Sequence, residues 1–187
     1  MNTTTTQNTT TELSMSSGLS FYAQPYSLDA HGFYFSDYED YTAKADALRD
    51  VYGNPVEEFE IQIVDGDAEE VDLFTACGVN QANLEQFFDD VLTLDDHQKP
   101  AFFYLMNVLN CSIEQALDKI DEPSIYEGEL KDAAEELFDE CYLSDIPESV
   151  RNYIDYAAFA RDCELAGDMT EFDFAGTTYT VTNAACC

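Results

Sequence analysis

Residues 132–140 read DAAEELFDE, a stretch that joins an apolar stripe to five carboxylates and contains no Lys or Arg. From Ala134 to Cys141 the apolar residues recur at i, i+3, i+4 and i+7, which is the spacing of one face of an amphipathic helix. The acids fill the other faces, where like charges four residues apart cost about 0.2–0.5 kcal/mol per pair. The stretch therefore predicts a helix that folds onto a core and presents a self-repelling anionic surface.

The same excess of acid runs through most of the chain. Its 187 residues include 39 Asp and Glu against seven Lys and Arg, a formal net charge of −32. Residues 1–36 hold two acids and no base, whereas residues 37–173 hold 37 acids and all seven bases. The chain also has 13 Phe, 12 Tyr and 45% hydrophobic residues, enough for small packed cores. The charge is therefore expected on a folded body and not on an acidic tail.

The opening residues, MNTTTTQNTTTELSMSSG, lack the basic and apolar regions of a signal peptide. We expect residues 1–19 to form a disordered polar extension. No apolar stretch approaches the ~18 residues of a membrane span. Six cysteines without a C-x-x-C pair indicate reduced thiols, and from these we expect a cytoplasmic chain. Cys141 and Cys163 occupy apolar helical positions typical of buried thiols, and Cys186–Cys187 have no assigned role.

The N-terminal third has the pattern of a small sheet with one helix. Strands are predicted at residues 20–26 and 32–36, and a half-buried strand at 57–64, where apolar and acidic residues alternate. Between them, residues 38–52 predict a helix that Gly53 ends.

Helical periodicity follows from residue 80. We expect one helix capped by Asn80 or Asn83, a second opened by Asp95/Asp96 and a third capped by Ser112. Pro123–Gly128 is predicted to interrupt the helical structure. After the break come a helix near 129–141, another with Pro147 in its first turn, a helical stretch to about residue 165, and strands at 169–174 and 177–182 that meet at Ala175-Gly176.

The sequence offers little for catalysis. His31 and His97, the two histidines, lie in no nucleophile or zinc spacing, and no glycine-rich phosphate loop is present. Residues 65–76 begin like an EF-hand, but Glu70 replaces the turn glycine and Ala76 replaces the bidentate Glu. We therefore reject an EF-hand and expect no enzyme and no cofactor. Loose cation binding stays open.

Three interpretations of the acids differ in what they predict. A generic solvated face normally intersperses Lys with Glu, and adaptation to high salt should also charge the N-terminal stretch; neither fits. Mimicry of DNA fits better, because a net charge of −30 on residues 37–173 equals that of roughly 15 base pairs, or ~50 Å of duplex. Direct nucleic-acid binding is opposed by the same charge.

The residues also carry a family resemblance. SVRNYIDYAAFARDCELAGD (149–168), followed by a short aromatic and Thr-rich hairpin, resembles the C-terminal region of the ArdA antirestriction family. EEFEIQIVDGD and the acidic helical stretch before Pro123 are similar to the middle of those proteins. The resemblance covers about residues 57–182. Residues 1–19, the Cys-ended tail and an N-terminal region without Trp depart from the family pattern.

The resemblance implies an elongated, curved α+β chain of three small domains, with a small antiparallel sheet plus helix, a helical unit, and helices plus short antiparallel strands. The expected ranges are 20–72, 73–122 and 123–183, between the extension 1–19 and the tail 184–187. It further implies a homodimer formed through the C-terminal domain. Such proteins mimic bent B-form DNA, occupy the DNA-binding site of Type I restriction-modification enzymes and protect incoming mobile genetic elements.

Two sets of residues follow from this resemblance. The family's antirestriction motif, next to the expected dimer contact, corresponds to Ala160, Arg161, Asp162, Cys163, Glu164, Leu165, Ala166 and Gly167. The acids expected to stand for phosphates toward the methyltransferase core are Glu57, Glu58, Glu60, Asp65, Asp67, Glu69, Glu70, Asp89, Asp90, Asp95, Asp96, Asp118, Asp121, Glu122, Asp132, Glu135, Glu136, Asp139, Glu140 and Asp145.

Other binding functions remain as alternatives. The chain could inhibit another nucleic-acid-handling protein, such as a CRISPR effector or a repressor, or act as an acidic chaperone of basic proteins. A loose calcium buffer is a further alternative. None of these involves a membrane partner.

Overall fold

A three-stranded antiparallel sheet opens the part of the chain that the computed structural model describes, residues 18–187. Its strands are β1 (Ser20–Pro25), β2 (Phe33–Phe35) and β3 (Phe59–Asp65), in the order β2-β1-β3. In β3, Phe59 and Ile61 are buried while Glu60 is exposed, which confirms the predicted alternation. The predicted disordered extension lies outside the described residues, apart from Gly18 and Leu19.

Helix α1 (Tyr38–Ala47) follows β2 and packs on the sheet through Tyr41, whose ring lies 5.0 Å from that of Phe35. The predicted helix to residue 52 is wrong: Leu48 is already extended. The carboxylate of Asp50 accepts from the amides of Tyr52 (2.9 Å) and Asn54 (2.8 Å). These bonds stabilise a tight turn, which the backbone adopts instead of continuing the helix.

Helix α2 (Ala68–Ala76) was not predicted, because its sequence resembles the start of a cation loop. Asp67 and Glu70 form a capping box, each side chain accepting from the other's backbone amide. The D-x-x-E spacing before Val71 and Leu73 is the signal that could have identified this helix.

The middle of the chain is helical, as predicted. A short α3 (Leu84–Gln86) continues into a π-helical turn (Phe87–Val91), and α4 (Gln98–Asn107) and α5 (Ile113–Asp118) follow. Ser112 caps α5 in a capping box with Gln115, and the Asp95 carboxylate accepts from Gln98 at 2.9 Å. The predicted Ser112 cap is confirmed, and Asp95 lies in the turn that opens α4 as predicted, but α4 itself has no side-chain cap. Asn83 stands at the N-cap position of α3 without a side-chain cap bond, so the predicted cap by Asn80 or Asn83 is not formed.

A second antiparallel sheet lies after the helices, in the order β4-β6-β5. β5 (Thr170–Phe174) and β6 (Thr177–Val181) form the predicted hairpin, whose turn residues Ala175 and Gly176 have φ of +52° and +79°. The predicted break at Pro123–Gly128 instead contains strand β4 (Ile125–Glu127). It pairs with β6, a partner distant in sequence, which local patterns do not show.

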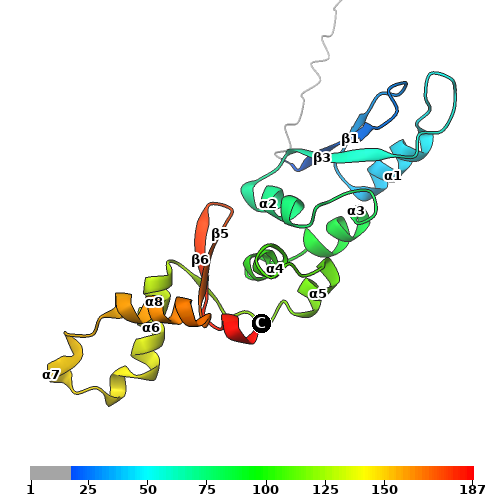
Figure 1. The fold of residues 1–187 in the computed structure, drawn as a ribbon. Helices are drawn as coiled ribbons and strands as arrows, with labels where there is room; N and C mark the ends of the chain where they lie inside the picture. Colours follow the sequence, from blue (N-terminus) through cyan, green and yellow to red (C-terminus); the bar gives the residue numbers. More distant parts are fainter. Residues whose placement is uncertain (1–17) are drawn as a thin grey trace, which may run out of the picture.

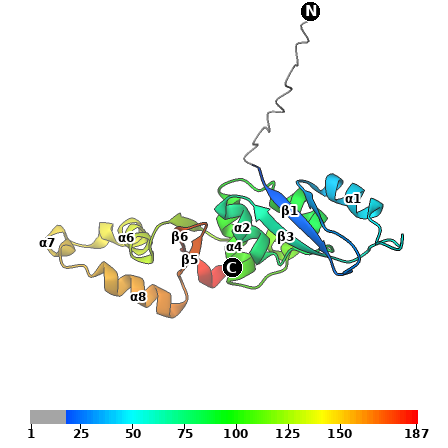
Figure 2. The same ribbon diagram turned by 90° about the horizontal axis from the view of Figure 1, so that it is seen from above.

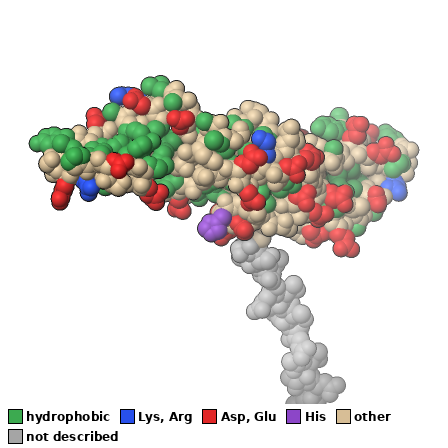
Figure 3. Space-filling model, turned by 90° about the horizontal axis from the view of Figure 1, so that it is seen from below, with side chains coloured by type: hydrophobic (Ala, Val, Ile, Leu, Met, Phe, Trp, Pro, Cys, Tyr) green, Lys and Arg blue, Asp and Glu red, His purple; other side chains and the backbone are tan. Residues whose placement is uncertain are grey.

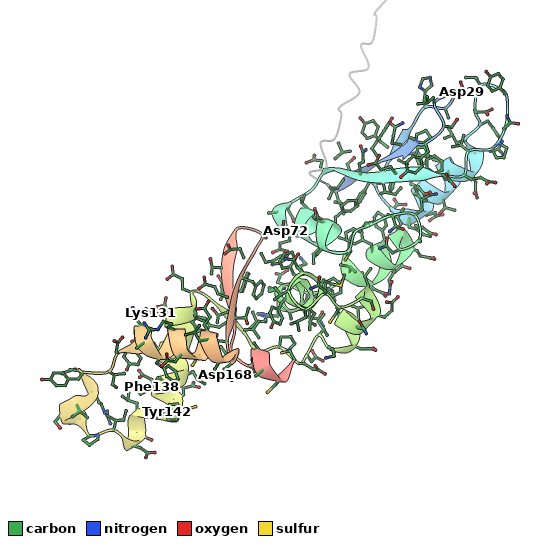
Figure 4. All side chains as sticks on the ribbon, viewed as in Figure 1. Asp29, Asp72, Lys131, Phe138, Tyr142 and Asp168 are labelled. Carbon is green, nitrogen blue, oxygen red and sulfur yellow. The ribbon has the colours of Figure 1, made fainter. Side chains whose placement is uncertain are left out.

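This second sheet rests on α4. Phe103 lies 4.9 Å from Phe174, and Tyr104 lies 5.4 Å from Phe172, as ring centroid distances. The amide of Ala175 donates to the Asp72 carboxylate of α2 at 2.7 Å, and Figure 4 shows Asp72 beside the hairpin turn. A single buried cluster therefore extends from β1 to β6. The three-domain division stays a proposal, with α2 running across its first boundary.

The C-terminal helices form a smaller core of their own. Helices α6 (Leu130–Cys141) and α8 (Tyr156–Ala166) enclose Ala134, Ala160 and Cys163. A 3-10 turn (Leu143–Asp145) and α7 (Glu148–Arg151) connect them at one end of an elongated molecule (Figures 1 and 2). A last 3-10 turn, Ala184–Cys186, ends the chain. The α+β prediction is confirmed.

Cys163 is buried as predicted, but Cys141 is exposed. Helix α6 buries Ala133 and Ala134 near its start, so the apolar stripe loses its cover toward Cys141 at the opposite end.

We expect Phe172→Ala to lower the free energy of unfolding by about 3–5 kcal/mol, because it removes the ring that joins β5 to α4. Denaturant unfolding measures this change. The control Tyr52→Ala, at an exposed turn, should have little effect. A small loss for Phe172→Ala would contradict a shared core.

Candidate functional site: an anionic surface

The predicted acids of the first sheet follow one path along the chain. Glu57 and Glu58 precede β3, Glu60 and Asp65 lie on it, and all four are exposed. The path continues into α2, where Asp67 is exposed and Glu69 and Glu70 are half-buried. Here the outward positions of a strand and the first turn of a helix place carboxylates on the surface.

The acids of the middle helices lie at helix ends and turns. They are Asp89 and Asp90 in the π-helical turn, Asp95 and Asp96 before α4, Asp118 at the end of α5, and Asp121 and Glu122 after it. All seven are exposed. Asp95, Asp96 and Asp121 border a hollow of about 490 Å³ together with Glu127. Glu127 was not among the predicted acids, because it lies on β4, a strand that the sequence patterns did not predict.

On α6 the predicted acids divide into two groups. Asp132, Glu136 and Glu140 are exposed and recur every four residues, so they form one stripe along the helix. Glu135 and Asp139 are half-buried on the side toward α8, where Asp139 accepts from the Tyr156 hydroxyl at 2.6 Å. Asp145, in the following 3-10 turn, is exposed.

Five of the seven basic side chains have local partners. Lys44 pairs with Asp40 (2.6 Å), Lys99 with Glu69 (2.6 Å) and Lys119 with Glu122 (3.4 Å). Arg49 and Arg151 donate to main-chain carbonyls of their own segments. The Glu69 carboxylate raises the pKa of Lys99, which therefore stays charged. The bases thus neutralise a few individual acids and leave the surface anionic.

Most of the predicted acids have free carboxylates. Asp67 and Glu70 form the capping box of α2, Asp95 accepts from the Gln98 amide, Asp139 bonds Tyr156, and Glu69, Asp96 and Glu122 form ion pairs. Within residues 18–187 the other thirteen have no side-chain hydrogen bond or ion pair in the fold. Figure 3 shows Asp and Glu gathered over the N-terminal and middle part of one face. These carboxylates are available to cations of a partner.

The predicted antirestriction motif lies on α8. Ala160 and Cys163 are buried against α6, whereas Arg161, Asp162, Glu164, Leu165 and Ala166 are exposed. Gly167 ends the helix with φ of +79°, as its predicted stop requires.

Hydrophobic side chains gather at this end of the molecule (Figure 3). Leu165, Tyr153, Tyr142 and Val150 are all exposed there. Exposed apolar groups at this density mark surfaces that contact other proteins.

The remaining reactive groups have ordinary surroundings. Burial raises the pKa of the Cys77 thiol to about 12 and also raises that of Cys163, so both stay protonated and unreactive. His31 lies in the exposed loop after β1, and His97 precedes α4. Among the described residues no group of His, Cys, Asp and Glu has the arrangement of a metal site.

A family model described as antirestriction protein (ArdA) matches residues 7–175. A search of curated proteins found no match. In residues 18–187 every helix is too short or too polar to cross a membrane.

We expect the Tyr156–Asp139 hydrogen bond to stabilise the α6–α8 pair in a pH-dependent way. The bond to Asp139, with burial, raises the pKa of Tyr156 from 10.0 to about 12. The neutral phenol is therefore favoured by folding, and its contribution is complete below pH 10.0 and is lost as the pH rises through about 12.

Tyr156→Phe should therefore lower thermal stability at neutral pH and remove the highest-pH step from the absorbance titration of the tyrosines. Tyr142→Phe, in the same aromatic cluster, is the control and should keep that step. An unchanged titration of Tyr156→Phe would contradict the assignment.

Proposed function

Since the chain belongs to the ArdA family of antirestriction proteins, we propose that it inhibits Type I restriction-modification enzymes as a mimic of bent B-form DNA. In this proposal it occupies the DNA-binding site of the methyltransferase core and excludes DNA. It acts in the cytoplasm as a binding protein without a cofactor or catalytic activity, and it protects the DNA of incoming mobile elements.

One observation carries the proposal: exposed carboxylates without intramolecular partners follow an elongated body from β3 to α6. A groove that grips duplex DNA presents Lys and Arg at the positions of phosphates. Free carboxylates can accept from those groups without first breaking bonds in the fold. Attraction between opposite charges also speeds the encounter, most strongly at low salt.

Helix α6 supports the same proposal through its energetics. Asp132, Glu136 and Glu140 repel one another along the stripe, and its last turn carries Glu140 where a helix favours cations. The repulsion destabilises the free protein. Basic groups of the partner would relieve it, so part of this cost returns as binding free energy.

We further propose a homodimer through the C-terminal helices. The exposed Tyr142, Val150, Tyr153 and Leu165 supply an apolar surface next to the motif residues Ala160–Gly167. An isologous contact there would place two anionic bodies end to end and extend the charged surface across the two-fold axis.

The main test is co-purification of the full-length chain with a Type I methyltransferase core, with and without competing duplex DNA. We expect a complex that duplex DNA displaces, because both ligands need the same groove. A complex that excess duplex leaves intact would contradict mimicry. A nuclease panel and a histone-like basic protein, run in parallel, test the CRISPR, repressor and chaperone alternatives.

We expect Glu136→Gln/Glu140→Gln to stabilise the protein by roughly 0.5–1 kcal/mol, because it removes two like-charge pairs of α6. The same variant should bind the methyltransferase core more weakly and with a shallower salt dependence. Thermal unfolding and titration binding at several salt concentrations measure both effects.

The matched control is Glu136→Asp/Glu140→Asp, which changes both side chains and keeps both charges. It should bind like the unmodified chain. Equal binding by the Gln variant would remove α6 from the proposed interface.

A further inference from the structure

The end of the molecule opposite the α6–α8 helices carries a second group of exposed apolar side chains. Tyr26 is 65% exposed, Leu28 fully, Val51 71% and Tyr52 76%. They lie on two loops, residues 26–32 between β1 and β2 and residues 48–58 before β3. We call these four residues the N-terminal tip. Figure 4 shows Asp29, from the first loop, at this extreme end.

The loops that carry the tip are held in place by hydrogen bonds. The amide of Val51 donates to the carbonyl of Asp29 at 3.0 Å and joins the two loops. The Asp50 carboxylate accepts three bonds, one from the amide of Tyr52 and two from Asn54. These bonds also lower the pKa of Asp50, with the Asn54 side chain as the largest cause, so the carboxylate stays ionised. The turn therefore presents Val51 and Tyr52 in a fixed position.

Folding does not explain these four side chains. An exposed side chain at a turn gains almost no burial, and turns favour Gly, Asn, Asp and Ser. Among residues 18–187, eight of the twelve large hydrophobic residues that are exposed belong to the two ends of the molecule, four at each. Grouped apolar exposure of this kind marks a contact surface.

The surroundings of the tip define the chemistry of its partner. Tyr26, Asp50, Glu57 and Glu58 line a hollow of about 260 Å³ between the two loops. Carboxylates beside an aromatic ring fit a Lys or Arg side chain. They oppose contact with an anionic lipid surface, and they repel a second copy of the same tip. The matching surface is therefore an apolar pocket of a protein, bordered by basic side chains.

We propose that the N-terminal tip inserts into such a pocket on the enzyme, beside the groove that the carboxylates occupy. This inference rests on the proposed function, and the observation that carries it is that Glu57 and Glu58 continue directly into the acids of β3. The carboxylates imitate the phosphates that every DNA duplex presents, whereas the tip makes an apolar contact that DNA does not make. It would give the inhibitor selectivity and a long residence time on the enzyme.

The test compares dissociation from an immobilised Type I methyltransferase core. The tip variant is Leu28→Ser/Val51→Ser, and the matched control is Leu109→Ser/Val71→Ser, which removes one Leu and one Val at exposed positions outside the tip. We expect the tip variant to dissociate about 10-fold faster, with an unchanged association rate and salt dependence, because apolar anchors act mainly on dissociation.

The outcomes separate this inference from the proposed function. If the unmodified chain fails to bind the core, the proposed function fails. If the chain binds but the tip variant and the control dissociate at the same rate, the inference about the tip is wrong. It is also wrong if sedimentation shows that the tip variant changes self-association, since the tip would then contact a second copy. Thermal unfolding confirms that both variants are folded.

Discussion

Repulsion between carboxylates is the constraint on which this structure depends. A net charge of −32 on 187 residues opposes compaction, and salt screens it only beyond about 8 Å at physiological ionic strength. The fold answers in two ways. An aromatic core runs continuously from β1 to β6 and supplies the burial that holds the chain together. The elongated body spreads the acids over more surface than a sphere would, which keeps many of them apart.

The acids have two different roles within that arrangement. A minority supports the fold: Asp67 caps α2, Asp95 closes the turn before α4, Asp72 holds the β5–β6 turn, and Asp139 joins α6 to α8. Their carboxylates are engaged and their removal would act on stability. The acids on the outer side of β3, in the π-helical turn and along the stripe of α6 make no such contacts. Only this second group could bind the proposed partner without breaking a contact of the fold, so composition alone would overstate the size of the proposed interface.

Apolar exposure is confined largely to the two ends of the anionic body. At one end the exposed apolar side chains lie beside the motif on α8, and at the other end they lie on two hydrogen-bonded loops. Charge and apolar contact would then act at different stages of binding, since long-range attraction governs the encounter and buried anchors govern residence. Under the proposed function, recognition of a basic groove and recognition of one particular protein would therefore rest on different parts of the surface.

The features that could be predicted from the sequence rest on local interactions. The amphipathic period of α6, the alternation in β3, the capping residue Ser112, the turn that Asp95 closes before α4 and the Ala175-Gly176 turn all rest on contacts within a few residues. The other features depend on how distant segments of the chain pack together. Strand β4 exists because β6 pairs with it, and α1 ends early because Asp50 closes a competing turn. The place where α8 packs against α6 decides that Cys141 is exposed and that Asp139 is hydrogen-bonded. Contacts of this kind join residues distant in sequence, so no periodic pattern in the chain predicts them.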